Sequence, residues 1–189
     1  NQDIYALESH RRSINAINAG HFKSEIIPIQ VTERNGKVIV DTDEHPRYKK
    51  HNEVYILDTS IDEMSKLKPV FRKNGTVTAG NSSGINDGAA AILMMTGEKA
   101  KQLGVKPMVR WLGSASAGVD PSIMGYGPVP ATKKLLNRLG ISIDEIGLIE
   151  LNEAFAAQAI GCIKRLGLNP EITNVNGGAI ALGHPTGCS

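Results

Sequence analysis

The residues best suited to chemistry in this chain follow two short apolar runs. His184 closes one such run in NVNGGAIALGHPTG, where Pro185 holds it extended. Asn152 follows another in LIELNEAFAAQ. A histidine fixed on a turn is suited to acid–base catalysis or to hydrogen bonding an oxyanion, and an asparagine at a strand end can orient a water molecule or a carbonyl oxygen. The structural alternatives are that Asn152 only caps a helix and that His184 only packs in a turn.

A third stretch, GTVTAGNSSGINDGAAA, crowds small and hydroxyl residues between positions 76 and 88. Its polar backbone could line a narrow tunnel that admits a slender ligand. An ordinary surface loop has the same composition, and chemistry alone favours the loop.

The first 75 residues predict a helix and two strands that precede these stretches. Apolar residues recur at helical spacing over residues 1–19, and Gly20 is suited to end that helix. The runs at 25–31 and 37–41 read as strands of a hairpin that turns at Asn35-Gly36. The polar segment 45–58 reads as a surface excursion. A capping box of Ser60 and Glu63 then opens a short helix that Pro69 ends.

From residue 75 onward the pattern predicts an α/β fold. Apolar runs at 89–95, 108–112, 148–151 and 172–175 alternate with helical stretches at 98–103, 131–139 and 153–166. Such alternation favours βαβ units and a mainly parallel sheet. A second capping box, Ser142 with Glu145, precedes the third run. We place a domain boundary near residue 75.

Composition excludes several classes of function. The chain has 189 residues, 41% of them apolar and 21% charged, with a net charge of +2 that predicts neither a nucleic-acid partner nor a membrane partner. The two cysteines are no disulfide framework and predict a reducing, cytoplasmic compartment. The five histidines lack the spacing of metal ligands. The glycines at 177, 178 and 183 do not form the dinucleotide-binding pattern.

Taken together, four motifs resemble those of the thiolase family. They are NSSGINDGAAA, MGYGPVPA, NEAFAAQ and NVNGGAIALGHPTGCS, and they occur in the family's order and spacing. The likeness extends upstream through HRRSINAINAGHFKSEIIPI and so covers nearly the whole chain. The resemblance implies an α/β fold with a thiolase-like βαβαβ layered sheet. Residues 1–75 would end the loop domain, and residues 76–189 would form a truncated C-terminal domain.

The resemblance implies an acyl-CoA acyltransferase that performs Claisen condensation of acetyl-CoA or thiolytic cleavage of a 3-ketoacyl-CoA. On that reading His184 activates a cysteine nucleophile and holds the thioester oxygen, and Asn152 holds a water that donates to the same oxygen. The implied substrate contacts are Ser83 on the pantetheine arm, Met124, Ala154 and Phe155 at the acyl end, and Arg47 at the CoA phosphates. The segment 48–58 looks like an insertion beside Arg47, which weakens that assignment.

The resemblance also implies the ligands and partners of the chain. Coenzyme A thioesters are substrates, so no cofactor is expected, and the partners are a homodimer or homotetramer or the remainder of the same protein. The nucleophilic cysteine would precede residue 1 and a proton-transferring cysteine would follow Ser189, while Cys162 and Cys188 are expected only to pack. We therefore expect a fragment that is inactive and poorly soluble alone. The alternative is a non-catalytic CoA-binding or assembly subunit.

Overall fold

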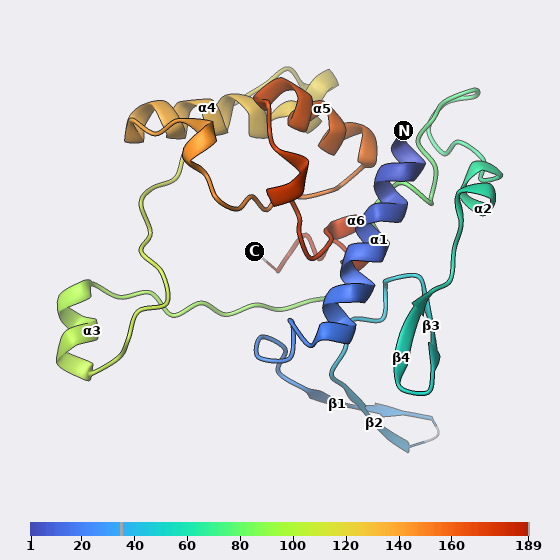
Figure 1. The fold of residues 1–189 in the computed structure, drawn as a ribbon, viewed down its shortest axis with the longest axis horizontal. Coiled ribbons are helices and arrows are strands. Elements are labelled where there is room, and N and C mark those ends of the chain that lie inside the picture. Colours follow the sequence, from blue (N-terminus) through green and yellow to red (C-terminus); the bar gives the residue numbers. More distant parts are fainter. Residues whose placement is uncertain (35, 189) are drawn as a thin grey trace.

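The computed structural model describes residues 1–34 and 36–188, a mixture of helices and a few short strands (Figure 1). In chain order the elements are α1 (Gln2–Ala19), β1 (Ile29–Glu33), β2 (Gly36–Val40), β3 (Tyr48–His51), β4 (Val54–Leu57), α2 (Ile61–Ser65), α3 (Gly97–Leu103), η1 (Pro121–Tyr126), α4 (Pro128–Leu139), η2 (Ile143–Glu145), α5 (Ala156–Leu166), η3 (Pro170–Ile172) and α6 (Ala179–Leu182). The η elements are short 3₁₀ helices.

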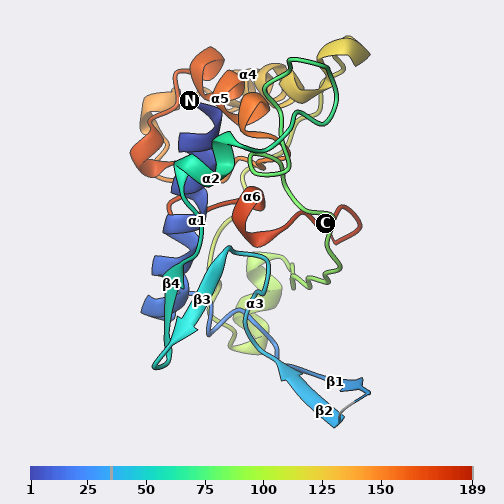
Figure 2. The ribbon, with the colours of Figure 1, turned by 90° about the vertical axis from the view of Figure 1, so that its right-hand side faces the viewer.

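Helix α1 is the centre of the fold, and its predicted extent is confirmed. It ends at Gly20, whose left-handed backbone (φ 75°) lets its N–H reach back to the carbonyls of Ala16 and Ile17. One face of the helix is buried against α2, β4, α5 and α6 (Figures 1 and 2). That face carries polar side chains as well as apolar ones, including Ser9 and His10. The buried polar groups must therefore find partners on the neighbouring elements.

Two antiparallel hairpins follow α1. Strands β1 and β2 pair from Ile29 opposite Val40 to Glu33 opposite Gly36, which confirms the predicted hairpin, although Asn35 of its turn lies outside the described residues. The segment 45–58, predicted to be a surface excursion, is mostly exposed and contains the paired strands β3 and β4. The left-handed backbones of Asn52 and Glu53 (φ 46° and 66°) make its tight turn.

Local capping signals place the helices well. The Ser60 hydroxyl accepts the Glu63 N–H at the start of α2, and Ser142 and Glu145 form a complete capping box at η2. Helix α3 begins at Gly97, within one residue of prediction, and α4 begins at Pro128, three residues early. Helix α5 begins three residues late, at Ala156 rather than at Glu153.

The predicted layered parallel sheet is where structure and sequence differ most. The runs 89–95 and 108–112 form no strand, and 148–151 and 172–175 meet only through one parallel bridge, Ile149 to Thr173. A strand needs a neighbour for its backbone groups, and within the described residues the first two runs make no backbone hydrogen bond. Their side chains are exposed, with Ile92 at 86% and Met108 at 98%. Figure 1 shows both runs in extended segments that lead to and from α3.

The buried apolar residues form two small clusters on either side of α5. One lies between α4, α5 and the segment 149–151, around Val129, Leu151 and Cys162. The other joins α1, α2 and α6 to α5, around Ala6, Met64 and Ile180. The segment 151–155 crosses between these clusters, so the structure holds it from both sides.

Candidate functional site

The structure brings together the two residues that the sequence singled out for chemistry. The Asn152 Nδ2 atom lies 3.4 Å from the His184 Nε2 atom, although the residues are 32 positions apart. An amide N–H donates, and the His184 tautomer whose proton is on Nδ1 leaves Nε2 as the acceptor of this contact. A nitrogen lone pair at Nε2 can take a proton from a thiol. The resulting imidazolium can then donate a hydrogen bond to a developing oxyanion.

His184 is placed by the turn that follows α6. Its backbone N–H donates to the Gly84 carbonyl (3.2 Å) and to the Asn86 Oδ1 atom (3.3 Å), and Ile85 bridges to His184 in parallel. Gly183 has φ 100°, and a Cβ there would lie 2.5 Å from Asn86 Oδ1. Only glycine fits this close approach. The glycines before His184 therefore serve the turn that presents it.

Asn152 is placed by the end of the segment 149–151. The Asn174 side chain pairs with Leu151 in both directions: its Oδ1 accepts the Leu151 N–H and its Nδ2 donates to the Leu151 carbonyl, each at 2.8 Å. The helix-cap alternative for Asn152 is wrong, because Phe155 occupies the N-cap position of α5. The Asn152 side chain is exposed and free to face His184.

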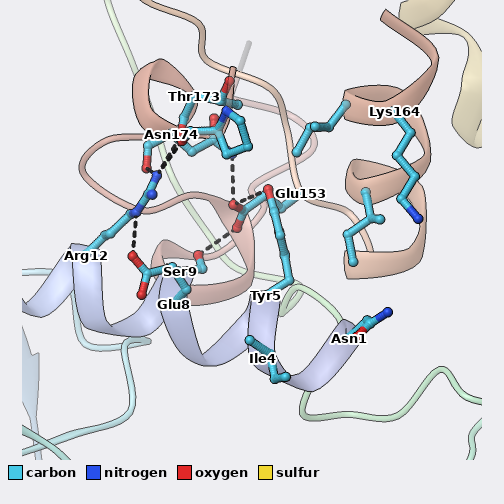
Figure 3. Close-up of a pocket in the computed structure, with 13 residues that line it drawn as sticks. Asn1, Ile4, Tyr5, Glu8, Ser9, Arg12, Glu153, Lys164, Thr173 and Asn174 are labelled. Atoms are coloured by element: carbon cyan, nitrogen blue, oxygen red, sulfur yellow. Dashed lines mark hydrogen bonds and ion pairs between the residues drawn. The ribbon is translucent and has the colours of Figure 1, made fainter. Parts of the chain in front are cut away.

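A residue that the sequence analysis missed, Glu153, is the most densely bonded side chain of the site (Figure 3). It is 1% exposed, and its Oε1 atom accepts from Tyr5 Oη (3.0 Å) and Asn174 Nδ2 (2.8 Å). Its Oε2 atom accepts from Ser9 Oγ (2.7 Å) and the Ile180 N–H (3.2 Å). Burial and the neighbouring Glu153 carboxylate raise the pKa of Tyr5, which stays a phenol donor.

One signal in the sequence could have found Glu153. Glu153 lies one residue after the apolar run 148–151, at the start of the predicted Ala-rich helix 153–166, so it stands between two segments that are expected to be buried. Acidic residues are almost never fully buried unless they are paired or hydrogen-bonded, so that placement required a set of donors.

The pocket drawn in Figure 3 has a volume of about 380 Å³ and lies beside Glu153. Tyr5, Ser9 and Asn174 line it together with α5 residues such as Lys164. Neither Asn152 nor His184 lines it, so this pocket is separate from the Asn152–His184 pair.

Three of the five predicted substrate contacts are brought together. The Ser83 N–H donates to the Ala154 carbonyl (3.0 Å), and Ser82 bridges to Phe155. The Phe155 ring packs edge-on against Phe71, with centroids 5.7 Å apart. These contacts place the polar stretch around Ser83 alongside the segment that carries Asn152.

Met124 and Arg47 lie apart from that group. The Met124 side chain is 74% exposed on η1, which packs against α5. The Arg47 guanidinium donates to the Ala79 carbonyl at 3.5 Å, and its backbone N–H donates to His10 Nδ1 at 3.3 Å. The β3–β4 hairpin closes directly on this residue, because the Asp58 N–H donates to the Arg47 carbonyl (2.8 Å).

The cysteines sit outside the pair. Cys162 is buried in α5, where burial raises its pKa, and its thiol donates to the Gly125 carbonyl at 3.3 Å. This confirms Cys162 as a packing residue. Cys188 is half-buried and unbridged. Across residues 1–34 and 36–188, no group of histidine, cysteine or acidic side chains is arranged to hold a metal ion, and no helix is long and apolar enough to cross a membrane.

Sequence profiles of known families match both parts of the chain. The profile of the thiolase N-terminal domain matches residues 1–98, and that of the thiolase C-terminal domain matches residues 105–189. A beta-ketothiolase of Cupriavidus necator is 52% identical over 189 residues. An acetyl-CoA acetyltransferase of Pseudomonas aeruginosa is 51% identical over 189 residues. Both matches cover 100% of this chain and 46% of the relative, so the chain spans about half the length of these proteins.

Solved structures give the same picture of the fold. The acetyl-CoA acetyltransferase of Bacillus anthracis superimposes with a TM-score of 0.92 at 46% identity, over 99% of this chain and 45% of that one. Human mitochondrial 3-ketoacyl-CoA thiolase superimposes with a TM-score of 0.86 at 42% identity, over 100% of this chain and 45% of that one.

Proposed function

The chain belongs to the thiolase family, and from that premise we propose that it supplies Asn152 and His184 to the active site of an acyl-CoA thiolase. The reaction is the thiolytic cleavage of a 3-ketoacyl-CoA or its reverse, the Claisen condensation of acetyl-CoA. The observation that carries the proposal is the 3.4 Å approach of Asn152 Nδ2 to His184 Nε2.

The proton of a cysteine thiol goes to His184 Nε2 in the cleavage direction. The thiolate attacks the keto carbon of the substrate, and the bond between that carbon and the α-carbon breaks. The electron pair moves onto the thioester as an enolate, and a second cysteine protonates the α-carbon. The second cysteine, now a thiolate, takes the proton of the coenzyme A thiol, and the acyl group passes to the coenzyme A sulfur. The first cysteine leaves as a thiolate and recovers its proton from His184.

The developing enolate oxygen needs donors that are in place before the charge appears. Once Nε2 is protonated it no longer accepts from Asn152 and donates to the enolate oxygen instead. The Asn152 amide then holds a water that donates to the same oxygen. One such donor is typically worth about 3 kcal/mol of barrier. The turn at Gly183 and the Asn174 clamp on Leu151 support this role, because they hold the two residues without help from the substrate.

The substrate is expected to lie along the stretch that contains Ser83, Ala154 and Phe155. Ser83 contacts the pantetheine arm, and Met124, Ala154 and Phe155 line the acyl end. Arg47 meets the CoA phosphates, which requires its side chain to turn away from the Ala79 carbonyl. Cys162 is not the nucleophile in this proposal, because it is buried and bonded to Gly125, and Cys188 is expected to pack, so the nucleophilic cysteine is expected from another segment of the protein or from another chain.

The test is an assay of acetoacetyl-CoA cleavage by the complete protein that carries residues 1–189. We expect coenzyme A-dependent loss of substrate and an acylated cysteine detectable by mass spectrometry. Iodoacetamide should alkylate that cysteine rapidly and leave Cys162 unmodified. Coenzyme A binding without turnover would support the assembly-subunit alternative instead, and absence of both would overturn the proposal.

A further inference from the structure

We infer that Glu153 is the positioning residue that holds Asn152 and His184 in register. The inference rests on the proposed function, because it concerns the geometry of that same pair. The Glu153 carboxylate accepts four hydrogen bonds from three parts of the chain: helix α1, the loop at Asn174 and helix α6.

These donors tie the two halves of the site together. Glu153 follows Asn152 directly, so its carboxylate fixes the segment on which Asn152 lies. The Ile180 N–H belongs to the first turn of α6, four residues before His184, and it donates to the same carboxylate at 3.2 Å. One side chain thus connects the chain segments that carry the donor and the acceptor of the 3.4 Å contact.

The hydrogen bonds around Glu153 all run toward its carboxylate. The Gly178 N–H donates to Ser9 Oγ (3.1 Å), whose own hydroxyl donates to Glu153 Oε2. The Asn174 amide and the Ile180 N–H can only donate toward Glu153. Each Glu153 oxygen therefore accepts from at least one group that can only donate.

The adjoining loop supports the same arrangement. Asn174 adopts φ 50°, a left-handed conformation that asparagine tolerates better than most non-glycine residues. Its side chain there makes three bonds: two to the Leu151 backbone and one to Glu153. The loop thus bends so that one amide clamps the segment before Asn152 and the carboxylate after it.

The substitution Glu153→Gln separates this role from simple packing. Glutamine keeps the size of the side chain, but its amide nitrogen must face either Asn174 Nδ2 or the Ile180 N–H, and two donors repel. The matched control is Glu63→Gln, which removes an exposed carboxylate of the same size. Glu63 accepts from Ser60 Oγ (3.0 Å) and is hydrogen-bonded to neither Asn152 nor His184.

Two readouts on the complete protein test the inference. Hydrogen–deuterium exchange of the peptide covering residues 179–188 should be about tenfold faster in E153Q and unchanged in E63Q. The reason is that E153Q weakens the hydrogen bond between the Ile180 N–H and the side chain at position 153. The kcat for acetoacetyl-CoA cleavage, measured well below the melting temperature of each variant, should fall about 10- to 100-fold with KM nearly unchanged, as misplacement of reacting groups predicts.

The outcomes are distinguishable. Unchanged exchange in E153Q overturns the inference, whatever the activity. Faster exchange with an unchanged kcat overturns it as well, because Glu153 would then serve stability alone. If E153Q exchanges faster but the wild-type protein shows no turnover, the proposed function is overturned. The structural connection that Glu153 makes between the two segments would still be established.

Discussion

At the scale of single residues, the chemistry of this chain depends on a histidine whose Nε2 atom accepts a hydrogen bond. Asn152 supplies that bond, and the Gly183 turn fixes the backbone of His184. An imidazole nitrogen that can exchange the Asn152 hydrogen bond for a proton, with an amide beside it, forms a site that can both take a proton and stabilise an oxyanion.

Replacing this histidine tests its chemical role directly. We expect His184→Ala in the complete protein to lower kcat for acetoacetyl-CoA cleavage about 100- to 1,000-fold, the loss that follows removal of an oxyanion donor. Steady-state kinetics measure it. His51→Ala, on the exposed end of the β3–β4 hairpin, should leave kcat as it is. Equal activity of H184A and wild type would remove His184 from the mechanism.

A second histidine predicts a pH dependence of stability. His10 is 1% exposed, and burial, followed by the nearby charges of Arg47 and His45, lowers its pKa from 6.5 to about 4. Between these values the unfolded chain binds the proton and the folded chain does not, so stability falls as pH drops from about 6.5 toward 4 and is complete above that range. The lowered pKa of His10 thus reduces the free energy of unfolding by about 3 kcal/mol in total over this pH range.

Urea unfolding of wild type and His10→Gln between pH 4.5 and 7.5 measures this dependence. The free energy of unfolding should fall more steeply with acid in the wild type than in H10Q. Parallel curves would show that His10 titrates alike in the folded and unfolded chain.

At the scale of elements, the start of α6 depends on the absence of a side chain at Gly178. A Cβ at that position would lie 2.4 Å from the Glu153 carboxyl carbon. The same backbone N–H donates to Ser9 Oγ. The element therefore begins where a glycine lets the chain touch a buried carboxylate.

We expect Gly178→Ala to destabilise the protein by about 1–3 kcal/mol, the range for overpacking a filled interior. Gly147→Ala is the matched control, because a Cβ there meets nothing within 4 Å. Thermal unfolding of both variants measures the difference. If G178A melts together with G147A, the close packing of α6 on Glu153 is refuted.

At the scale of the whole molecule, two apolar runs have no cover. Ile92, Leu93, Met108 and Trp111 are each more than 60% exposed in the extended segments around α3. Large exposed apolar patches favour association, and extended chain with unpaired backbone groups is a template for strand pairing.

We therefore expect residues 1–189 alone to self-associate, and the double substitution Ile92→Asp with Leu93→Asp to reduce that association. Light scattering across a concentration series measures it. The control is Lys99→Asp, an exposed charge change on α3 between the two runs. If I92D/L93D associates as strongly as wild type, these runs are not the surfaces that drive it.

The features that could be predicted from the sequence alone are local. The bounds of α1, the Gly20 stop, the caps at Ser60 and Ser142 and the first hairpin all depend on groups within a few residues of each other, so a short window contains the cause. The motif residues Asn152 and His184 were also found this way, because their types and neighbours carried the signal. The domain boundary near residue 75 stays a prediction.

How distant segments meet could be seen only in the folded chain. The role of Glu153 depends on donors from α1, from the loop at Asn174 and from α6, up to 148 residues away, and no window around NEAF contains them. The same holds for the strands that did not form: residues 89–95 and 108–112 have strand-like composition, but a strand exists only where a neighbour accepts its hydrogen bonds. The local sequence determines which conformations a segment favours, and contacts with distant segments determine which of these conformations forms.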